Sequence, residues 1–524
     1  MTALRGVHFV AGVPEVGDGA VFTAVDPQPG TSLAPSYHEA NPAQIARAGE
    51  AAAAAAPVFA AMPGTQRATL LRTIADGLIA LGDTLVARVV AETALPAARA
   101  AAERGRTVLQ LQQFAALLEQ GAWVQARIDR ADRNRQPQPK PDVRSMLVPI
   151  GPVVVFGASN FPLAYSVAGG DTASALAAGC PVIVKAHPAH PGTSELVGGV
   201  IAAAVAKLGL PAGTFSLLHG RTPATGGALV QHPSVRAVGF TGSHAAGRAL
   251  CDLAAARPDP IPVFAEMGSM NPVLVLPRAL LARGPAIAEQ LAASALLAMG
   301  QFCTSPGLVA FVEGDGAERF CATLRDRLAA STGGPTVHPT IRSNYERALA
   351  EVQGLPVEVE ARGQAGAGAT AVCPTLLRAS ATALQQHPRL RSEIYGPAVL
   401  VVACRDVGEL QAVVRSLSGH LTATVHGDGD DFGDFAGAID ALRARVGRLI
   451  ANGVPTGVEV CAAMVHGGPW PASSDARFSA VGTTSIHRWV RPACWQDWPQ
   501  DRLPPELRDD NPLGIARQID GTWS

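Results

Sequence analysis

The pattern of hydrophobic and polar positions changes twice along the chain. From about residue 42 to 130, alanine, leucine and arginine recur at helical spacing, as in RATLLRTIADGLIALGDTLVARVVAETALP. This spacing predicts a set of amphipathic helices. The polar, proline-containing stretch from Arg127 to Arg144 follows. It has too little apolar content for a core, and both a disordered linker and an exposed β-arm are compatible with it.

Beyond this stretch, short apolar runs alternate with helical segments. The first runs are LVPIGPVVVFGA, PVIVKAH, TFSLLHG and VRAVGFTGS. Continuous apolar strands separated by helices predict a parallel sheet covered on both faces. A second unit of this kind begins near Ile261, with the runs NPVLVLP, GLVAFVEG, AVLVVACR and LTATVHG. We therefore expect an α/β fold with two doubly wound parallel-sheet domains, whose ligands bind beyond the carboxyl ends of the strands.

The same pattern divides the chain into three parts. Residues 1–260 are expected to form a first domain, with residues 127–144 as a projecting arm, and residues 261–450 to form a second domain. Residues 451–524 are expected to return to the first domain. From Trp489 onward this tail is rich in proline and tryptophan, which indicates that it covers another surface and contributes to contacts between subunits.

Composition and charge exclude several classes of protein. With 524 residues, 48% of them hydrophobic and 16% charged, the chain can bury more than one large core and is not disordered. Lysine and arginine number 42 against 43 aspartate and glutamate, and no long basic run occurs, which excludes nucleic acid as the main partner. We find no export signal and no stretch of about 18 uninterrupted apolar residues. The scattered cysteines form no C-x-x-C pair, so we expect a cytoplasmic protein without a membrane or metal partner.

Two residues are candidates for covalent chemistry. Cys303 lies in GQFCTSPG, after a long apolar helix and close to glycines. Such a position can expose and activate a thiol, although an isolated cysteine is usually a small buried hydrophobe. Glu266 follows an apolar run in FAEMGSMN. Burial there would raise its pKa toward the range of a general base, whereas on its own it could equally be a surface or salt-bridged glutamate.

Two further segments suit the binding of negative charge. In VFGASNFPLA, the side-chain amide of Asn160 could donate to a developing oxyanion, or Asn160 could simply form a turn. In VRAVGFTGSHAAG, a strand ends in a glycine turn and Ser243 opens a helix, whose backbone amides attract a pyrophosphate. This is not the G-x-G-x-x-G fingerprint, so a plain strand-to-helix turn is equally compatible with it.

Six motifs together resemble those of the aldehyde dehydrogenase superfamily, in the same order and over nearly the whole chain. They are GASNFPLA, ALAAGCPVIVKAH, VGFTGS, AEMGSMNP, GQFCTSPG and SEIYGPAV. The resemblance implies that Cys303 attacks the aldehyde carbonyl and that Asn160, with the Cys303 backbone amide, stabilises the oxyanion. It implies that Glu266 activates the water that hydrolyses the thioester. It further implies that the first domain binds a nicotinamide cofactor, that the second is catalytic, and that the arm and tail build a homodimer or homotetramer.

The resemblance also assigns cofactor contacts. It implies that Lys185 contacts the adenosine ribose or its phosphate and that Glu393 contacts the nicotinamide ribose. Tyr395 stands where the family more often has phenylalanine. The turn that would hold the pyrophosphate consists of Phe240, Thr241, Gly242 and Ser243.

Departures from the family pattern favour NADP as the cofactor, with NAD as the alternative. Many NAD-preferring members carry a glutamate three residues after the lysine, where this chain has Pro188. Lys185 would then supply charge for a 2′-phosphate, with His187 and Arg221 as candidate helpers or as solvated loop residues. Ser159 replaces a common tryptophan, and of a usual glycine pair only Gly268 is present. These changes resemble an NADP-linked subgroup that includes 2,5-dioxopentanoate (α-ketoglutarate semialdehyde) dehydrogenases and some fatty-aldehyde dehydrogenases.

The residues from Pro455 to Asp475 also resemble that subgroup. His466 lies there in a glycine-rich loop, where it could shuttle a proton near the active site or only shape the loop. The expected reaction is the NADP-dependent oxidation of 2,5-dioxopentanoate to 2-oxoglutarate, with a small-molecule aldehyde as the partner. The sequence does not identify the residue that binds the substrate carboxylate.

Three alternatives are left open. The substrate could be a medium- or long-chain fatty aldehyde if an apolar tunnel is lined by Phe156, Phe161, Phe302 and Trp470, each of which could instead be a core residue. A second alternative is a cofactor-free thiol hydrolase that uses Cys303 with His466. The third is a non-catalytic relative with the same fold, although such a protein has no need of Cys303, Glu266 and Asn160 together.

Overall fold

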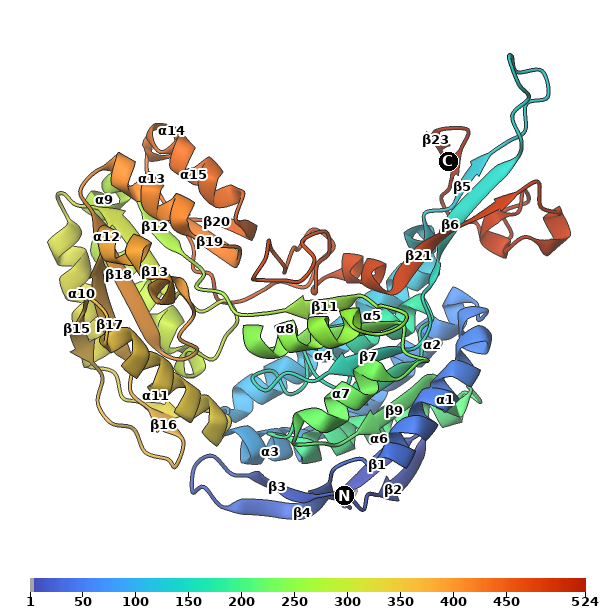
Figure 1. Ribbon diagram of the computed structural model, residues 1–524, viewed down its shortest axis with the longest axis horizontal. Helices are drawn as coiled ribbons and strands as arrows, with labels where there is room; N and C mark the ends of the chain where they lie inside the picture. The colour runs from blue at the N-terminus through green and yellow to red at the C-terminus, as the bar shows by residue number, and fades with distance from the viewer. Residues whose placement is uncertain (1–3) are drawn as a thin grey trace.

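The computed structural model describes residues 4–524 and shows two α/β domains side by side, with a β-arm that projects from the first of them (Figure 1). The predicted amphipathic helices are present between residues 42 and 120. They are α1 (Pro42–Ala60), α2 (Gly64–Ala80), α3 (Gly82–Thr93) and α4 (Ala97–Gln120). Asn41 and Gln44 form a reciprocal capping box that fixes the start of α1. Gly121, with a φ of +72°, ends α4.

The first domain is built on a seven-stranded sheet with the order β11-β10-β7-β8-β9-β1-β2. Its strands are β1 (Val7–Val10), β2 (Val13–Val16), β7 (Val153–Phe156), β8 (Val182–Lys185), β9 (Phe215–Leu218), β10 (Ala237–Thr241) and β11 (Val263–Glu266). Strands β7 to β11 are parallel, β1 pairs antiparallel with β9 at one edge, and β2 pairs antiparallel with β1. The connecting helices are α5 (Gly170–Ala178), α6 (Pro191–Lys207), α7 (Pro223–Gln231) and α8 (His244–Ala255). A separate hairpin is formed by β3 (Val21–Val25) and β4 (Ser32–His38).

The second domain has its own seven-stranded sheet, with the order β15-β17-β18-β13-β12-β19-β20. Its strands are β12 (Val273–Val275), β13 (Leu308–Val312), β15 (Val357–Arg362), β17 (Thr375–Ser380), β18 (Ala398–Cys404), β19 (His420–His426) and β20 (Val446–Ala451), and only β15 is antiparallel to its neighbour. Its helices are α9 (Pro277–Leu296), α10 (Ala317–Ala329), α11 (Pro339–Gln353), α12 (Ala381–Gln386), α13 (Val407–Ser416), α14 (Asp431–Asp434) and α15 (Ala436–Arg443). The short strands β14 (Gly334–Pro335) and β16 (Ala371–Val372) pair with each other. The predicted fold of two doubly wound sheets is confirmed.

The predicted boundary at residue 261 is wrong by about one strand. Strand β11 pairs in parallel with β10 over Val263 to Glu266 and is the edge strand of the first sheet. The second sheet begins only at β12. The apolar run before Glu266 predicted a strand but not the sheet that it joins, because pairing between distant strands is a long-range property. As a result Glu266 lies at the carboxyl end of the edge strand of the first sheet.

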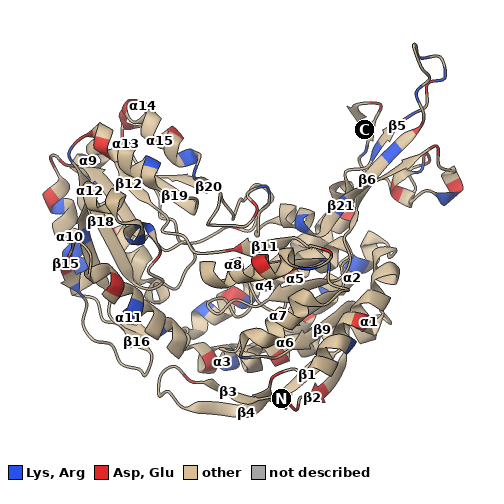
Figure 2. Cartoon of the chain, in the orientation of Figure 1, with Lys and Arg blue, Asp and Glu red and all other residues tan. Residues whose placement is uncertain are grey.

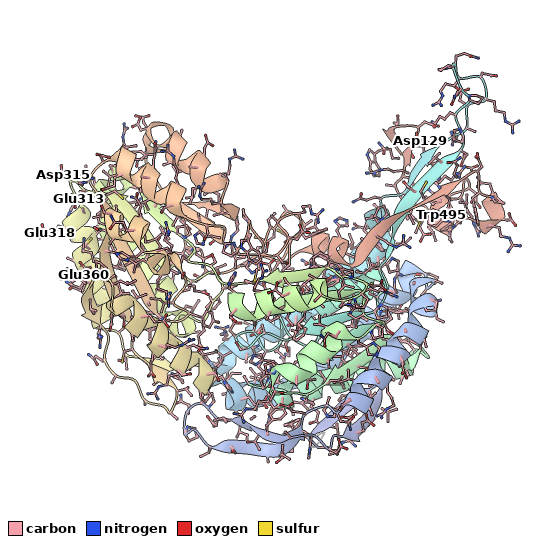
Figure 3. The ribbon with its side chains drawn as sticks, viewed as in Figure 1. Asp129, Glu313, Asp315, Glu318, Glu360 and Trp495 are labelled. Carbon is pink, nitrogen blue, oxygen red and sulfur yellow. The ribbon has the colours of Figure 1, made fainter. Side chains whose placement is uncertain are left out.

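The stretch after α4 forms a β-arm and not a disordered linker. Strands β5 (Arg127–Asp129) and β6 (Val143–Pro149) are antiparallel, and β21 (Val490–Gln496) from the tail pairs with β6 along its length. Two short tail strands, β22 (Gln518–Ile519) and β23 (Thr522–Trp523), complete this sheet. Figure 3 shows Asp129 and Trp495 on the projecting arm. The exposed tail residues Trp498 and Trp523 lie beside it, and its role in subunit contacts stays a prediction.

Positions of Lys and Arg and of Asp and Glu are interspersed along the elements of both domains, as Figure 2 shows. The labelled acidic residues Glu313, Asp315, Glu318 and Glu360 lie on the side of the second domain that faces away from the first (Figure 3). This acidic group is therefore remote from the space between the domains. Within residues 4–524, every helix is too short or too polar to cross a membrane.

Candidate active site

Cys303 lies in a tight loop between the 3-10 helix η3 (Leu297–Gly300) and β13. Three consecutive residues before it have left-handed backbones: Ala298, Met299 and Gly300, with φ values of +47°, +55° and +65°. A Cβ at Gly300 would lie 2.2 Å from the carbonyl oxygen of Gly396, so only glycine fits there. Non-glycine residues in this region are strained, and such strain is concentrated at functional sites. The half-buried thiol of Cys303 is thus presented by a loop with one defined shape.

Asn271 holds this loop in place, and the sequence alone did not single it out. Its side-chain amide donates to the carbonyl oxygens of Cys303 and Ser305, both at 2.9 Å. Its side-chain oxygen accepts from the hydroxyls of Ser269 at 2.9 Å and Thr422 at 3.0 Å. The residue is fully buried and has a φ of +47°, a conformation that asparagine tolerates better than most residues. Asn271 therefore ties the nucleophile loop to both β12 and β19.

The structure brings His466 to the thiol, with 3.3 Å between Sγ of Cys303 and Nε2 of His466. Burial, together with the nearby charges of Arg448 and Arg106, lowers the pKa of His466 to about 3. Burial, together with the carboxyl groups of Glu266 and Glu393, raises the pKa of Cys303 to about 12. The resting pair is therefore a neutral thiol beside a neutral imidazole. These surroundings do not favour the thiolate at rest, so activation of the Cys303 thiol stays a prediction that depends on proton transfer to His466.

Glu266 ends β11 and is buried, with 7% of its surface exposed. Its Oε2 has no hydrogen-bond partner among residues 4–524. Burial raises its pKa well above the ordinary value, Asp171 raises it further, and Arg488 opposes the shift. The carboxyl is close enough to Cys303 to raise the pKa of the thiol. These are the surroundings that the sequence led us to expect for a general base.

Asn160 lies in the loop after β7 and is also buried. Its side-chain amide donates to the carbonyl oxygen of Gln301 at 3.0 Å. Because a side-chain amide carries two hydrogens, one remains free to donate to an oxyanion beside Cys303. Arg99 donates to the backbone oxygen of Asn160 at 2.9 Å. Asn160 is thereby tied to the nucleophile loop on one side and to α4 on the other.

Aromatic rings form one wall beside the thiol. The ring centroids of Phe161 and Phe302 are 5.4 Å apart, and the ring of Tyr165 lies 5.2 Å from that of Phe161 and 6.2 Å from that of His466. The guanidinium carbon of Arg99 lies 4.9 Å and 4.5 Å from the Phe161 and Phe302 centroids. The wall is therefore aromatic, and the guanidinium group of Arg99 stacks on two of its rings.

The other two aromatic candidates do not join this wall. Phe156 packs edge-on against Phe240, at 6.0 Å, under Gly226 of α7. Trp470 is 48% exposed and contacts His244 and Arg248 of α8, at 5.3 Å and 5.8 Å. The structure therefore places only Phe161 and Phe302 together, and the tunnel lined by all four residues stays an untested alternative. Residue type alone could not show which face of the fold each ring occupies.

Two arginines reach the same region from different elements. Arg106 of α4 donates to the carbonyl oxygen of Val458, and its Nη2 lies 3.5 Å from the hydroxyl of Tyr165. Arg448 of β20 donates to the carbonyl oxygens of Gly457 at 2.9 Å and of its near neighbour Pro455 at 2.6 Å. Neither forms an ion pair with a carboxylate of the described chain. The sequence did not point to either residue.

The candidate pyrophosphate turn has the geometry of an anion site. Ser243 caps α8, with its hydroxyl accepting from the amide of Ala246 at 3.3 Å. The amide of Gly242 donates to the backbone oxygen of Glu266 at 3.0 Å. Thr241 ends the preceding strand, and α8 begins directly after Ser243, so the free amides of its first turn could bind a phosphate group. The side chain of Phe240 is buried in the core, so only its backbone can take part.

Lys185 ends β8, where a cofactor ribose is expected. Burial lowers its pKa to about 8, and the charge of Glu39 opposes this shift. Glu39, which the sequence did not single out, accepts from the amides of Arg221 and Thr222 at 3.1 Å and 2.7 Å and from the Thr222 hydroxyl at 2.7 Å. A carboxylate is therefore close to Lys185, although none follows the lysine in the sequence.

His187 and the Glu393 segment complete the cofactor side. His187 stacks on His190, and its Nδ1 accepts from the amide of Ala189. Its pKa is well below the ordinary value because of burial and the neighbouring His190 and Lys185, so His187 supplies no positive charge.

Glu393 packs against the loop that follows Glu266, since a Cβ at Gly268 would lie 2.4 Å from its Oε2. Burial raises its pKa to about 8, and the amide of Ser269 opposes the shift. Tyr395 follows on the same segment, and burial raises its pKa well above the ordinary value. The cation of Lys185, the start of α8 and the carboxyl of Glu393 are groups that could hold a nicotinamide cofactor. In residues 4–524 we find no cluster of three or more His, Cys, Asp or Glu side chains that could hold a metal ion.

Comparison with known sequences matches these features to one family. A profile of the aldehyde dehydrogenase family matches residues 16–473. The protein named alpha-ketoglutaric semialdehyde dehydrogenase 2 of Azospirillum brasilense is 49% identical over 520 residues, which cover 99% of both chains. Alpha-ketoglutaric semialdehyde dehydrogenase of Acinetobacter baylyi is 40% identical over 528 residues, again with 99% of both chains covered.

Solved structures agree with the fold. Lactaldehyde dehydrogenase from Escherichia coli superposes with a TM-score of 0.79 at 21% identity, covering 94% of this chain and 98% of the other. A betaine aldehyde dehydrogenase variant from Staphylococcus aureus, solved with NAD+, gives a TM-score of 0.80 at 18% identity and covers 94% of this chain and 97% of the other. At these identities the likeness establishes the fold.

Proposed function

The chain belongs to the aldehyde dehydrogenase family, and on this premise we propose that it oxidises 2,5-dioxopentanoate, which is α-ketoglutarate semialdehyde, to 2-oxoglutarate with NADP. Oxidation of an aldehyde to its acid with a nicotinamide cofactor is the activity of the family. The substrate is supported by the two relatives of that name, which match over nearly their full length. The site observation that carries the proposal is the 3.3 Å contact between Cys303 and His466, beside the buried carboxyl of Glu266.

In the first step, Sγ of Cys303 adds to the aldehyde carbon and the thiol proton passes to Nε2 of His466. The imidazole is neutral, so it can accept this proton. Its low pKa means that it does not keep the proton, which can move on to solvent. The negative oxygen of the thiohemiacetal is stabilised by the free amide hydrogen of Asn160 and by the backbone N–H of Cys303.

The second step converts the thiohemiacetal into a thioester on Cys303. Lys185, the amides at the start of α8 and Glu393 would hold the cofactor. When bound, the nicotinamide accepts the two electrons and the hydrogen removed from the substrate carbon. As the carbonyl reforms, Asn160 releases the oxygen, and the acyl group remains bonded to Sγ.

The third step is hydrolysis. The raised pKa of Glu266 makes it a stronger base than an exposed glutamate. Glu266 takes a proton from water as the water oxygen attacks the thioester carbon. The C–S bond then breaks, Sγ recovers a proton, and the carboxylic acid leaves. Each of these three steps has a residue of this chain in contact with, or beside, the reacting thiol.

NADP is the cofactor that the local charges favour. Lys185 and Arg221 are cationic, and the position three residues after Lys185 is a proline. Glu39 opposes a 2′-phosphate, but its carboxylate is already engaged by the Arg221 and Thr222 amides. We also propose that the enzyme works in the cytoplasm as a homodimer or homotetramer, with the β-arm and the tail as the contact surface.

The test is the reduction of NADP or NAD, followed by the absorbance of the reduced nicotinamide, with 2,5-dioxopentanoate, succinate semialdehyde, hexanal and decanal. We expect the highest kcat/KM with 2,5-dioxopentanoate and NADP, and none with the Cys303→Ala variant. Preference for decanal would transfer the assignment to fatty aldehydes. Absence of reduction with all four aldehydes would refute the dehydrogenase assignment for these substrates and favour the cofactor-free hydrolase, which shares the contact between Cys303 and His466.

A further inference from the structure

We propose that Arg106 and Arg448 together form the subsite that binds the substrate carboxylate. This inference rests on the proposed oxidation of a carboxylated semialdehyde and assigns the residues that recognise it. The two arginines come from different domains, α4 and β20, and meet at the loop that precedes His466. No sequence pattern identifies Arg106 and Arg448 as carboxylate-binding residues, because only the fold brings them close to Cys303.

Both guanidinium groups hold the same loop from two sides. Arg106 bonds the carbonyl oxygen of Val458, and Arg448 bonds those of Gly457 and Pro455. Gln113, also on α4, adds a bond to Val460 at 2.8 Å. These contacts fix the orientation of both side chains before any ligand arrives. A pre-oriented planar guanidinium is the group best suited to a carboxylate, which it can bind through two parallel hydrogen bonds.

The positive charges of the pair are not neutralised. Their protein partners are carbonyl and hydroxyl oxygens, and no carboxylate of residues 4–524 lies in ion-pair contact with either. The Nε atoms of both Arg106 and Arg448 are buried without a hydrogen-bond partner in that part of the chain. Charged groups in such surroundings are costly unless an opposite charge joins them. An anionic ligand is therefore what completes the site.

The distances suit a short semialdehyde. In 2,5-dioxopentanoate, four carbon–carbon bonds of about 1.5 Å place the carboxylate carbon about 5 Å from the aldehyde carbon. Tyr165 is a neighbour of both groups: its ring centroid lies 6.2 Å from that of His466 and 5.9 Å from the guanidinium carbon of Arg106. A substrate whose aldehyde carbon is bonded to Cys303 can thus extend along the Tyr165 ring toward Arg106.

Tyr165 is suited to the 2-oxo group of such a substrate. Its hydroxyl already receives a contact from Arg106 and keeps its own hydrogen to donate. Burial raises the pKa of this hydroxyl, so it stays protonated at neutral pH. Arg99 is not part of the subsite, because its guanidinium is held between Phe161 and Phe302 and bonds the backbone of Asn160.

The test compares a carboxylated with an uncharged aldehyde of the same length. We would measure kcat/KM for 2,5-dioxopentanoate and for pentanal in Arg106→Gln and Arg448→Gln. The ratio of the two values is expected to fall about 10- to 100-fold in each variant, mainly through KM, because a charged hydrogen bond is lost. Matched controls are Arg104→Gln on the same helix and Arg443→Gln just before β20, which should keep the wild-type ratio. An unchanged ratio in both test variants would overturn the subsite.

A binding measurement separates this inference from the proposed function. In a Cys303→Ala background, calorimetry with glutarate should show binding that disappears in the two arginine variants and persists in the two controls. If wild-type enzyme prefers 2,5-dioxopentanoate but the arginine variants still bind glutarate, the function stands and the subsite is refuted. If wild-type enzyme shows no preference over pentanal, the proposed substrate is refuted, and the subsite with it.

Wild-type protein offers a check that does not depend on whether the variants fold. Glutarate should inhibit pentanal oxidation competitively, whereas its uncharged diamide should inhibit at least about tenfold less. Equal inhibition by the two compounds would contradict a cationic subsite beside Cys303. Arg106→Lys and Arg448→Lys keep the charge and should retain part of the glutarate affinity, which a purely structural role of the guanidinium groups would not explain.

Discussion

The thiol of Cys303 lies 3.3 Å from Nε2 of His466, a histidine whose pKa burial lowers to about 3. The two groups form a nucleophile–base pair by geometry, but not a thiolate–imidazolium pair at rest. The positive charges of Arg448 and Arg106 disfavour protonation of His466. The imidazole is therefore suited to a brief transfer of the proton during attack and not to its storage.

Replacing His466 should slow the attack of the thiol. We expect His466→Asn to lower kcat/KM about 10- to 100-fold, at the low end of general-base effects because the pKa of the imidazole is so low. Alkylation of Cys303 by iodoacetamide, followed by mass spectrometry, should slow in parallel. His387→Asn, at a half-buried position in the second domain, is the control. Unchanged alkylation and turnover in His466→Asn would assign His466 to loop shape alone.

Replacing Glu266 should separate oxidation from hydrolysis. Glu266→Gln is expected to give one rapid equivalent of reduced cofactor per site and then turnover reduced about 10²- to 10⁴-fold, because the thioester is not hydrolysed. The acyl-enzyme should be visible by mass spectrometry. In wild-type enzyme the hydrolysis rate should rise with pH through the raised pKa of Glu266, since only the ionised carboxyl accepts a proton. A hydrolysis rate that is flat from pH 5 to 9 would exclude this role.

Much of the fold was predictable because its signals are local. The helices of residues 42–120 and the apolar strands of both sheets follow from periodicity, and Cys303, Glu266 and Asn160 stand in recognisable motifs. Arg106, Arg448, Asn271 and Glu39 lack such signals, since each acts through partners far away in the sequence. For the same reason, β11 was assigned to the wrong domain.

The positions of the aromatic residues were only partly predictable from the sequence. Phe161 and Phe302 were predicted near the thiol and do lie beside Tyr165 and Arg99. Phe156 and Trp470 were grouped with them but occupy other faces of the fold. An aromatic side chain indicates that a contact is buried or stacked, but only the packed structure shows with what.

Glu393 should make the stability of the cofactor-free protein depend on pH. Its pKa is about 8 in the folded state, against an ordinary value of 4.5. Between pH 4.5 and pH 8, the carboxyl of Glu393 is protonated in the folded state but ionised in the unfolded chain. Its contribution to the free energy of unfolding is therefore full below about pH 4.5 and is lost as the pH rises to about 8. Urea unfolding at pH 5 to 9 should show a smaller decline in Glu393→Gln. Equal declines in both proteins would contradict the raised pKa.

Asn271 should act as a positioning residue for the nucleophile loop. Asn271→Ala removes bonds to the Cys303 and Ser305 carbonyls and leaves them buried, which should lower the free energy of unfolding by about 3 kcal/mol. It should lower kcat more than it raises KM, because Cys303 is displaced and the carboxylate subsite is not. Asn271→Asp, which keeps only the acceptor, should not restore kcat. A normal kcat in a destabilised Asn271→Ala protein would limit the residue to a structural role.

Lys185 should make the preference for NADP over NAD depend on pH. Its pKa is about 8, so its ammonium group is mainly charged at pH 7 and mainly neutral at pH 9.5. If this charge attracts the 2′-phosphate, the ratio of kcat/KM for NADP to that for NAD should fall over this interval in wild-type enzyme. Lys185→Gln should have a low ratio with little pH dependence. Glu39→Gln should raise this ratio at pH 7, because the substitution removes the carboxylate that opposes the phosphate. A lower ratio in Glu39→Gln would mean that Glu39 acts mainly by holding the turn at Arg221 and Thr222. A wild-type ratio near one at every pH would refute the NADP preference itself.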